Sequence, residues 1–460
     1  MRFSLKHIRK DINLSKHCLY RYILFLVILG NFCLTTAYAG SLPTHILWGR
    51  QYDSVHNDLP NAMHADPQGN LIIVGQSDTE IAGETLTPSF FITKIRPNGN
   101  LVWRIQIAKP GAEGEPLDVA VDADGQIYVA GRTYGSLFGK WSGDDDVFVG
   151  KWSSSGKLIW VRQFGTDALD EADSITLGNL GQVYVAGITG GTLYAKNAER
   201  NIDHFLTEYS RDGDLIAGSQ QEGGIRPGAL AADKTSHLYG AGDMGMVKGI
   251  LQEVSLTKYN SARQVEWVRY IPAIQATDAD ALTVVDNLVY LVGTTYHTNE
   301  TTRDEGGGRL PLLSSYLACF SAEGQYKWKK TWQRNSSIEF RRIAANQQFI
   351  YAAGLEELVH QPAGQSTMPW RLNHKAVITC LARDGHERWL QSFGAKERSG
   401  IQGLVLWNSH LYVAGFTSGS LFGKWNGRTS LFLAEVKRSL HGMPVKDPIV
   451  STGEGIDSTR

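Results

Sequence analysis

The sequence has little cysteine and no excess of charge of either sign. Only four cysteines occur in 460 residues, and two of them, Cys18 and Cys33, precede residue 40. A small fold held together by several disulfides is therefore excluded. The 45 Lys and Arg residues nearly match the 46 Asp and Glu residues, so we expect no general electrostatic binding to nucleic acid.

Long apolar runs are also scarce. The apolar run Tyr22–Leu34 follows a basic segment, residues 1–21, and precedes Ala37–Ala39. These three parts are typical of a secretory signal, with cleavage expected after Ala39. The alternative is a transmembrane anchor, but the run is shorter than the ~20 residues that a spanning helix needs. We therefore expect an exported protein, periplasmic, cell-surface or secreted, without a membrane span after cleavage.

Recognisable catalytic motifs are missing as well. The chain has no nucleophile elbow, metalloprotease helix, phosphate loop or paired-cysteine zinc motif. Its histidines lack the spacing of metal ligands. We therefore predict no cofactor and no metal site, and we assign no catalytic residue.

The chain does contain an internal repeat. "GSLFGKW" occurs at Gly135–Trp141 and again at Gly419–Trp425. "GQIYVAGRT" at Gly125–Thr133 returns as "GQVYVAGIT" at Gly181–Thr189 and as "SHLYVAGFT" at Ser409–Thr417. With weaker copies the repeat has seven units, each centred on one glycine: Gly75, Gly131, Gly187, Gly242, Gly293, Gly354 and Gly415.

Each unit has the pattern of four short strands. In the second unit these are Leu117–Val121, Gly125–Thr133, Asp146–Trp152 and Lys157–Phe164, joined by turns such as "DADG" and "SSSG". Apolar and polar residues roughly alternate, and no stretch has a capped helical period. Four antiparallel strands repeated seven times at a period near 55 residues predict an all-β, seven-bladed β-propeller.

The two ends of the repeat predict how the ring closes. The seventh unit stops after its third strand, Leu431–Lys437, whereas a surplus fourth strand, His45–Tyr52, precedes the first unit. We expect this strand to complete the last blade and to cover its open edge. The propeller would then span residues 40–437, followed by a polar tail, residues 438–460, that we expect to be disordered.

The repeat resembles the bacterial seven-bladed propeller repeat of the SBBP type. The resemblance is carried by "GQIYVAG" and "DVFVGKWSSSGKLIWVRQFG" in the second unit, and it weakens in units four to six. It implies a propeller in an extracellular or cell-envelope protein. That repeat marks no catalytic residues, so none are transferred to this chain.

Several acidic residues allow two interpretations. "DADG" at Asp122–Gly125 matches part of the sequence pattern of a calcium-binding loop. Too few oxygen ligands follow it, so a hairpin turn is favoured. Asp146 begins a third strand, where a short acceptor caps the backbone, although Asp144 and Asp145 beside it leave a cation site open. Three further Asp residues begin first strands, near the expected mouth of the channel, and are either structural or functional. They are Asp118, Asp173 and Asp280.

The aromatic and cysteine residues have expected places too. Fourth-strand tryptophans such as Trp103 and Trp160 should pack between blades. Cys319 and Cys380 occupy the same third-strand position of adjacent blades, so they should be buried free thiols rather than a disulfide.

The candidate recognition residues lie in the long connections between second and third strands. Blade 5 contributes Tyr296–Pro311 and blade 6 contributes Glu356–Lys375, and the residues there depart from the repeat. An inert insertion is the alternative. Exposed indoles in these connections would stack on a sugar ring or cover a blade edge. The candidate ligand-binding residues are His297, Arg303, Asp304, His360, Trp370, Arg371, His374, Trp141 and Trp425.

These observations favour a binding or scaffold module over an enzyme. The expected partner is an extracellular or envelope protein or glycan, held on the face with the long connections. The alternative is a secreted hydrolase or lyase with its site at the channel mouth, which would require polar side chains outside the repeat to converge there. A structural part of an envelope assembly would instead expose a broad apolar patch.

Overall fold

The computed structural model places most of the chain after residue 44. It describes residues 45–81, 84–194, 202–221, 228–242, 246–247, 250–251, 254–271, 276–303, 309–332, 336–358, 373–395 and 397–438. All of them belong to one compact unit, Ala37–Arg460. No helix that could span a membrane occurs among the described residues.

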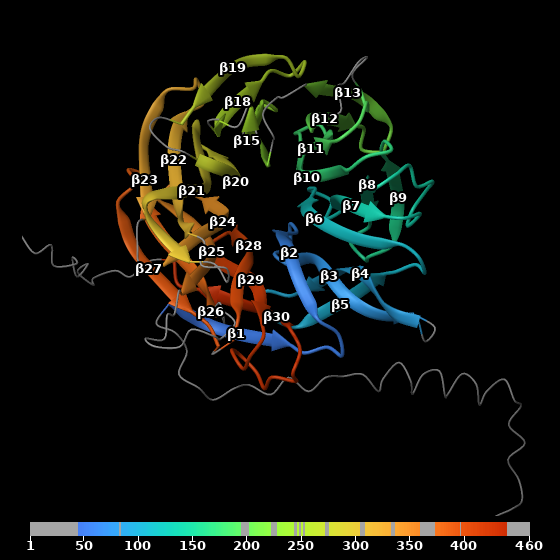
Figure 1. Ribbon diagram of the computed structural model, residues 1–460, viewed down its shortest axis with the longest axis horizontal. Helices are drawn as coiled ribbons and strands as arrows, with labels where there is room; N and C mark the ends of the chain where they lie inside the picture. Colours follow the sequence, from blue (N-terminus) through green and yellow to red (C-terminus); the bar gives the residue numbers. More distant parts are fainter. Residues whose placement is uncertain are drawn as a thin grey trace, which may run out of the picture. The chain divides into compact units, whose positions relative to one another are not determined.

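Seven sheets of four antiparallel strands form a ring (Figure 1). Blade 1 is β2 (Asp58–Ala65), β3 (Leu71–Ile81), β4 (Glu84–Ile95) and β5 (Leu101–Ile107). Blade 2 is β6 (Glu113–Val121), β7 (Ile127–Tyr134), β8 (Asp145–Trp152) and β9 (Leu158–Phe164). Blade 3 is β10 (Asp170–Leu177), β11 (Val183–Thr189), β12 (Asp203–Tyr209) and β13 (Leu215–Gln221).

The remaining blades repeat this order. Blade 4 is β14 (Ala229–Ala232), β15 (Leu238–Gly242), β18 (Ser255–Tyr259) and β19 (Val265–Tyr270), with a hairpin of β16 (Met246–Val247) and β17 (Ile250–Leu251). Blade 5 is β20 (Ala276–Val285), β21 (Leu288–Arg303), β22 (Arg309–Ser321) and β23 (Tyr326–Trp332). Blade 6 is β24 (Ser337–Ala345), β25 (Phe349–Leu358), β26 (Asn373–Ala382) and β27 (Glu387–Phe393).

Blade 7 is built from both ends of the ordered chain. It contains β28 (Ser399–Trp407), β29 (His410–Thr417), β30 (Ser430–Val436) and the N-terminal strand β1 (Ile46–Tyr52). β1 pairs antiparallel with β30, from Ile46 opposite Val436 to Tyr52 opposite Leu431. The predicted ring closure and the predicted seven-bladed propeller are both confirmed.

The core lies between the blades. Seven clusters of buried side chains each join two neighbouring blades; one, for example, joins Phe90 of blade 1 to Phe148 and Trp152 of blade 2. The fourth-strand tryptophans complete these contacts, as predicted. The indole nitrogens of Trp103 and Trp160 donate to the carbonyl oxygens of Ser154 and Arg211, in the next blade, at 3.3 and 3.1 Å.

The repeated glycine marks a close approach between the first and second strands of a blade. A Cβ atom on Gly131 would collide with the carbonyl oxygen of Glu115, and one on Gly187 would collide with that of Glu171. The first strand has an irregular register at this point, between Pro116 and Asp118 in blade 2. A side chain would push the first strand away from its neighbour, which explains why this glycine recurs.

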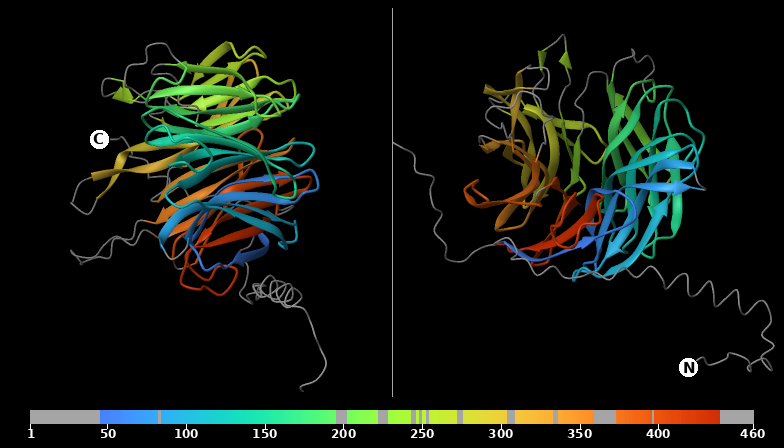
Figure 2. Two further views of the ribbon diagram at one scale, coloured as in Figure 1. Left: turned by 90° about the vertical axis from the view of Figure 1, so that its right-hand side faces the viewer. Right: turned by 60° about the horizontal axis from the view of Figure 1, so that its bottom comes forward.

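The connection in blade 5 differs from the expected loop. Residues 296–311 were expected to be irregular, but β21 runs to Arg303 and β22 starts at Arg309, with Thr301 paired to Pro311 and Arg303 to Arg309. Figure 2 shows this ribbon of β21 and β22 extending beyond the neighbouring strands of the ring. Threonine-rich segments such as Thr301–Thr302 suit an extended strand, so the excess length is taken up by pairing.

Both predicted free thiols are present. Cys319 of β22 and Cys380 of β26 are buried and unbridged. Burial raises the pKa of each thiol to about 12. The neutral thiol is therefore the stable form, and these cysteines act as small apolar residues of the core.

Ring closure should be essential for stability. Deleting residues 40–53 would leave β30 as an open edge and would remove Trp48 from the contact between blades 7 and 1. We expect the truncated protein to aggregate or to unfold without a single cooperative transition, as followed by circular dichroism during heating. Deleting residues 439–460 is the control. If the N-terminal deletion melts as the protein of residues 40–460 does, the closure strand is dispensable.

Candidate functional site

The two faces of the ring are built differently. Because the strands alternate in direction, the links between blades and the connections between second and third strands lie on one face, which we call the connection face. The hairpin turns between first and second strands, and between third and fourth strands, lie on the other, the turn face. The longest connections of the chain therefore gather on the connection face.

On the connection face, Trp141 and Trp425 are held in matching ways. The indole nitrogen of Trp141 donates to the Asp144 carbonyl oxygen at 2.6 Å, and that of Trp425 donates to the Arg428 carbonyl oxygen at 2.7 Å. The two residues are 38% and 40% exposed. Tyr134 packs against Trp141 edge to face, with ring centroids 5.0 Å apart. The polar atom of each indole is satisfied locally, which leaves its apolar surface available.

The repeated "GSLFGKW" segments are anchored by glutamines of the fourth strands. In blade 2, Gln163 accepts hydrogen bonds from the amides of Phe138 and Gly139 at 2.9 Å. In blade 7 the corresponding acceptor is Gln51 of β1, which binds the amide of Leu421 at 3.2 Å. The closure strand thus also holds the Trp425 loop in place.

The other predicted ligand-binding residues are only partly described. His297 and Arg303 lie in β21, whereas Asp304, His360, Trp370 and Arg371 lie outside the described residues. His374 lies at the start of β26, half-buried, opposite Glu357 of β25. Whether these residues form one surface with Trp141 and Trp425 stays a prediction.

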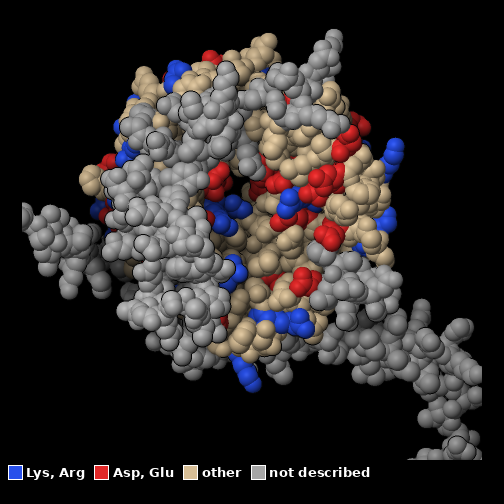
Figure 3. Space-filling model, viewed as in Figure 1, with Lys and Arg blue, Asp and Glu red and all other residues tan. Residues whose placement is uncertain are grey.

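A cavity lies at the centre of the ring, near the connection face. Its volume is about 420 Å³, within the range of small-molecule sites. Figure 3 shows acidic and basic side chains gathered around this hollow centre. The lining residues come mainly from the first strands of five blades and from β21 and β22: Asn61, Leu117, Asp278, Asp280, Thr294, Leu313, Glu339, Arg341, Arg342 and Gln402.

Arg342 ties three blades together at this cavity. Its Nε donates to the Gln402 carbonyl oxygen at 2.8 Å, and another guanidinium nitrogen donates to the carbonyl oxygen of Asn61. Its third nitrogen donates to the carbonyl oxygen of Arg341 at 2.8 Å. Burial lowers the pKa of Arg342, although the charges of Asp118 and Asp280 oppose this. All three nitrogens are bonded to backbone, so Arg342 acts as an internal brace.

Asp280 is the most perturbed carboxyl of the cavity. Thr294 donates to one of its oxygens at 3.1 Å. Desolvation, followed by the negative charge of Asp278, raises the pKa of Asp280 to about 7, and Arg341 only partly offsets this. At neutral pH this carboxyl therefore exchanges a proton, as a general acid or a ligand-linked acceptor must.

The carboxylate of Asp118, on the first strand of blade 2, is less available. Asp118 accepts hydrogen bonds from the amides of Ile175 and Val119, at 3.0 and 2.8 Å, and from the Ser174 hydroxyl, at 3.1 Å. It thereby joins blades 2 and 3. Burial nevertheless raises its pKa. The structural interpretation of Asp118 is supported, whereas Asp280 lines the cavity.

His374, one of the predicted recognition residues, is influenced by the charges of this cavity. Burial and the charge of Arg398 lower its pKa, while Glu339 of the cavity opposes this. Among the described residues, none forms a hydrogen bond with its Nδ1. The lowered pKa favours the neutral form of the His374 imidazole, and the charges of Glu339 and Arg341 in the cavity act on it.

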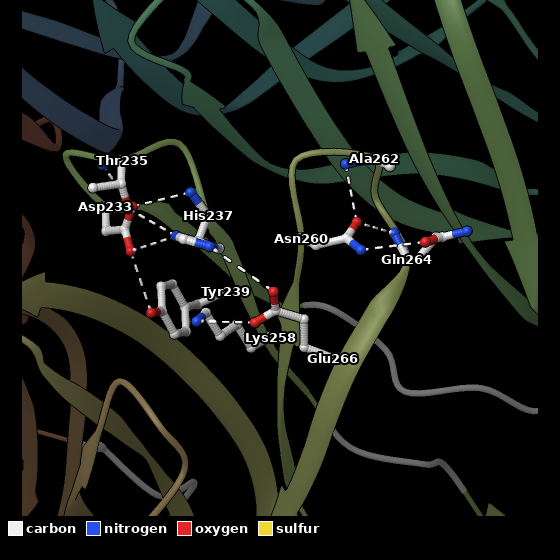
Figure 4. Close-up of polar contacts among 9 residues, drawn as sticks. All are labelled: Asp233, Thr235, His237, Tyr239, Lys258, Asn260, Ala262, Gln264 and Glu266. Carbon is white, nitrogen blue, oxygen red and sulfur yellow. Dashed lines mark hydrogen bonds and ion pairs between the residues drawn. The ribbon is translucent and has the colours of Figure 1, made fainter.

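Polar side chains stabilise hairpin turns on the turn face, as Figure 4 shows for blade 4. In blade 4, Asp233 accepts from the amides of Thr235 and His237 at 2.8 and 3.0 Å, and Asn260 accepts from the amide of Ala262 at 2.9 Å. Asp122 does the same in "DADG", where the amides of Asp124 and Gln126 donate to one oxygen at 2.9 Å. The hairpin interpretation of "DADG" is confirmed.

The acidic segment beside Trp141 is also internally paired. Asp146 accepts from the amide of Ser142 at 3.1 Å and from the side chain of Gln163 at 2.9 Å, as expected for a strand-entry cap. Asp145 forms an ion pair with Arg132 at 3.3 Å. The described residues contain no cluster of His, Cys, Asp or Glu that could hold a metal ion.

The sequence interpretation missed Glu339, Arg341 and Arg342. A signal was available, because blades aligned on the repeated glycine place Arg342 where blades 1, 5 and 7 have Ala62, Ala281 and Gly403. A long charged residue at a position that is small in these three blades departs from their pattern. Such a departure marks the cavity together with Asp280, which the sequence had singled out.

Asp280 should make the protein less stable as the pH rises. The pKa is 3.8 for an ordinary Asp carboxyl and about 7 in the folded protein, so the folded state holds the extra proton between these values. Stability from this group is present at low pH and is lost as pH rises toward and through 7. The free energy of unfolding can be measured with urea at pH 5 and at pH 8. Over this range it should fall by roughly 2–3 kcal/mol more for the wild type than for Asp280→Asn.

Asp212→Asn, at an exposed turn, is the charge-matched control for this measurement and should behave as the wild type. If Asp280→Asn shows the same pH dependence as the wild type, the carboxyl is not protonated in the folded state.

Comparisons with known proteins found similar solved structures but no family. No family model and no curated protein matches the chain. Hydrazine synthase from Kuenenia stuttgartiensis is similar in structure, with 13% identity, a TM-score of 0.49 and coverage of 82% of this chain and 97% of that chain. The polysaccharide lyase Uly1 shows 10% identity, a TM-score of 0.45 and coverage of 87% and 94%.

A protein of unknown function from Bacteroides caccae shows 14% identity and a TM-score of 0.37, over 65% of this chain and 92% of that chain. At such identities a likeness concerns the fold, and a fold hosts many functions. The chain is a seven-bladed β-propeller.

Proposed function

We propose that this chain is an exported binding module that holds an envelope or extracellular glycan on its connection face. The single observation that carries the proposal is the matched pair Trp141 and Trp425. Each indole nitrogen is bonded to a carbonyl oxygen of its own loop, and each ring is more than a third exposed. An aromatic surface whose polar atom is already satisfied suits the apolar face of a sugar ring.

Two further features support this proposal. The expected secretory signal and the resemblance to SBBP-type repeats favour an extracellular or envelope location. The loops that carry both tryptophans are pinned by Gln163 and Gln51, so the indoles are held in place before a ligand arrives.

Replacing both indoles should abolish glycan binding without unfolding the protein. Trp141→Ala combined with Trp425→Ala removes partly exposed rings, so we expect a melting temperature close to that of the wild type and at least about a tenfold loss of affinity. The measurement is binding of the mature chain, residues 40–460, to envelope and extracellular polysaccharides by affinity electrophoresis. Tyr326→Ala, an exposed aromatic on an outer strand, is the control.

Retention of full glycan binding by the double variant would move the site elsewhere. Pull-down from envelope extracts with the same variants tests the other class of partner. If the wild type captures a protein, binds no glycan and loses that protein in the double variant, the connection face binds protein and the glycan assignment is wrong.

A catalytic function at the central cavity is the second candidate, because Asp280 retains a proton near neutral pH beside Asp278 and Glu339. This arrangement would suit a general acid in a hydrolase or lyase. Such an enzyme would shorten a polysaccharide in a viscosity assay, and Asp280→Asn would slow it at least about a hundredfold. Equal activity of the wild type and the variant would exclude this mechanism.

A further inference from the structure

The central cavity contains side-chain oxygens that few donors of the protein contact. Asp280 uses one oxygen for Thr294, and among the described residues no side chain donates to the carboxylate of Asp278. Asn61 uses its amide nitrogen to bind the Pro116 carbonyl oxygen at 2.8 Å, which leaves its side-chain oxygen available. A ligand that brings donors can therefore bind to these oxygens.

The basic residues of the cavity already contact acceptors of the protein. Arg342 donates from each of its three nitrogens to backbone carbonyl oxygens. Arg341 forms an ion pair with Glu339 at 2.8 Å. Part of the positive charge and of the hydrogen-bonding capacity of both residues is therefore used within the protein.

The balance of charge points the same way. Three carboxyl groups, those of Asp278, Asp280 and Glu339, and two guanidinium groups line one cavity, so negative charge is in excess when Asp280 is ionised. A positively charged ligand would offset the excess and would relieve the repulsion between Asp278 and Asp280. The cavity also has polar groups, on Thr294 and Gln402, and apolar side chains, Leu117 and Leu313. Such a lining suits a polyhydroxylated ligand, whose hydroxyl groups and carbon skeleton need both kinds of contact.

We propose that the central cavity is a binding site for a small polyhydroxylated primary amine, held by Asp278 and Asp280. Its ammonium group lies against the two carboxylates, and its hydroxyl groups meet Asn61, Thr294 and Gln402. This site is separate from the tryptophan loops of the connection face, since none of the cavity residues belongs to those loops.

The proposal predicts that binding is coupled to a proton. The groups that face Asp280 are Asp278 on its own strand and Glu339, Arg341 and Arg342 on β24, and β21 contributes Thr294. The adjacent β14 (Ala229–Ala232) has no titratable side chain, and the hydroxyl of Tyr239 on β15 contacts Asp233 instead. A bound cation favours the ionised carboxylate, so binding should strengthen from pH 6 to pH 8 and release a proton near pH 7.

The test compares two probes of nearly equal size, glucamine and sorbitol, which differ only by an ammonium in place of a hydroxyl. Isothermal titration calorimetry with the mature protein should show glucamine binding at least about ten times more tightly than sorbitol at pH 8. Its affinity should fall several-fold at pH 6. Calorimetry in two buffers of different ionisation enthalpy should detect the released proton.

Variants assign the effect to the cavity. Asp280→Asn should remove both the preference for glucamine and the pH dependence, and Asp278→Asn should weaken glucamine binding. If Asp280→Asn does not fold, Glu339→Gln on another strand tests the same charge effect, because removal of this carboxylate should also weaken glucamine binding. Asp212→Asn is the charge-matched control on the turn face, and the Trp141→Ala and Trp425→Ala double variant should bind glucamine as the wild type does.

Four results would overturn the proposal: no binding of either probe, equal binding of both, tighter binding of the anionic glucuronate, or unchanged binding by a folded Asp280→Asn protein. If the double tryptophan variant loses glycan binding but still binds glucamine, the central cavity and the glycan site of the proposed function are independent.

Discussion

The pairing of β1 with β30 is the constraint on which the rest of the structure depends. A ring of sheets has its core between neighbouring sheets, so each blade needs a partner on both sides. The last blade obtains its fourth strand from the N-terminal end, and that strand brings Trp48 to the contact with blade 1 and Gln51 to the Trp425 loop. One strand thus closes a sheet, completes an apolar core and positions a surface loop.

Closure also determines what reaches the centre. The first strands converge there, and their backbones lie so close to the second strands that glycine recurs at the contact. Side chains that point inward have no apolar core to enter, and polar residues occupy these positions in blades 5 and 6. Arg342 satisfies carbonyl oxygens of blades 6, 7 and 1 at once, so a buried charge serves to hold first strands in register.

The fold could be predicted from the sequence because repetition multiplies weak signals. One unit such as Gly125–Phe164 is ambiguous, but seven glycines at similar spacing and a missing fourth strand are compatible with few architectures. The site was harder to predict for a physical reason. Asp280, Glu339 and Arg341 come from different strands, and their meeting depends on the ring rather than on local spacing. Tyr296–Pro311 was expected as a loop, since pairing across such a connection depends on partner register.

The two candidate surfaces differ in how they tolerate change. The tryptophan loops are joined to the ring by a few side-chain bonds, and substitutions there affect one blade. The cavity is formed by first strands that pack on one another around the whole ring, so an unpaired charge there affects several blades. Asp280 avoids part of this electrostatic cost by holding a proton when the cavity is empty. A cationic ligand would remove that need, and ligand binding at the centre would then stabilise the contacts between blades that support the connection face.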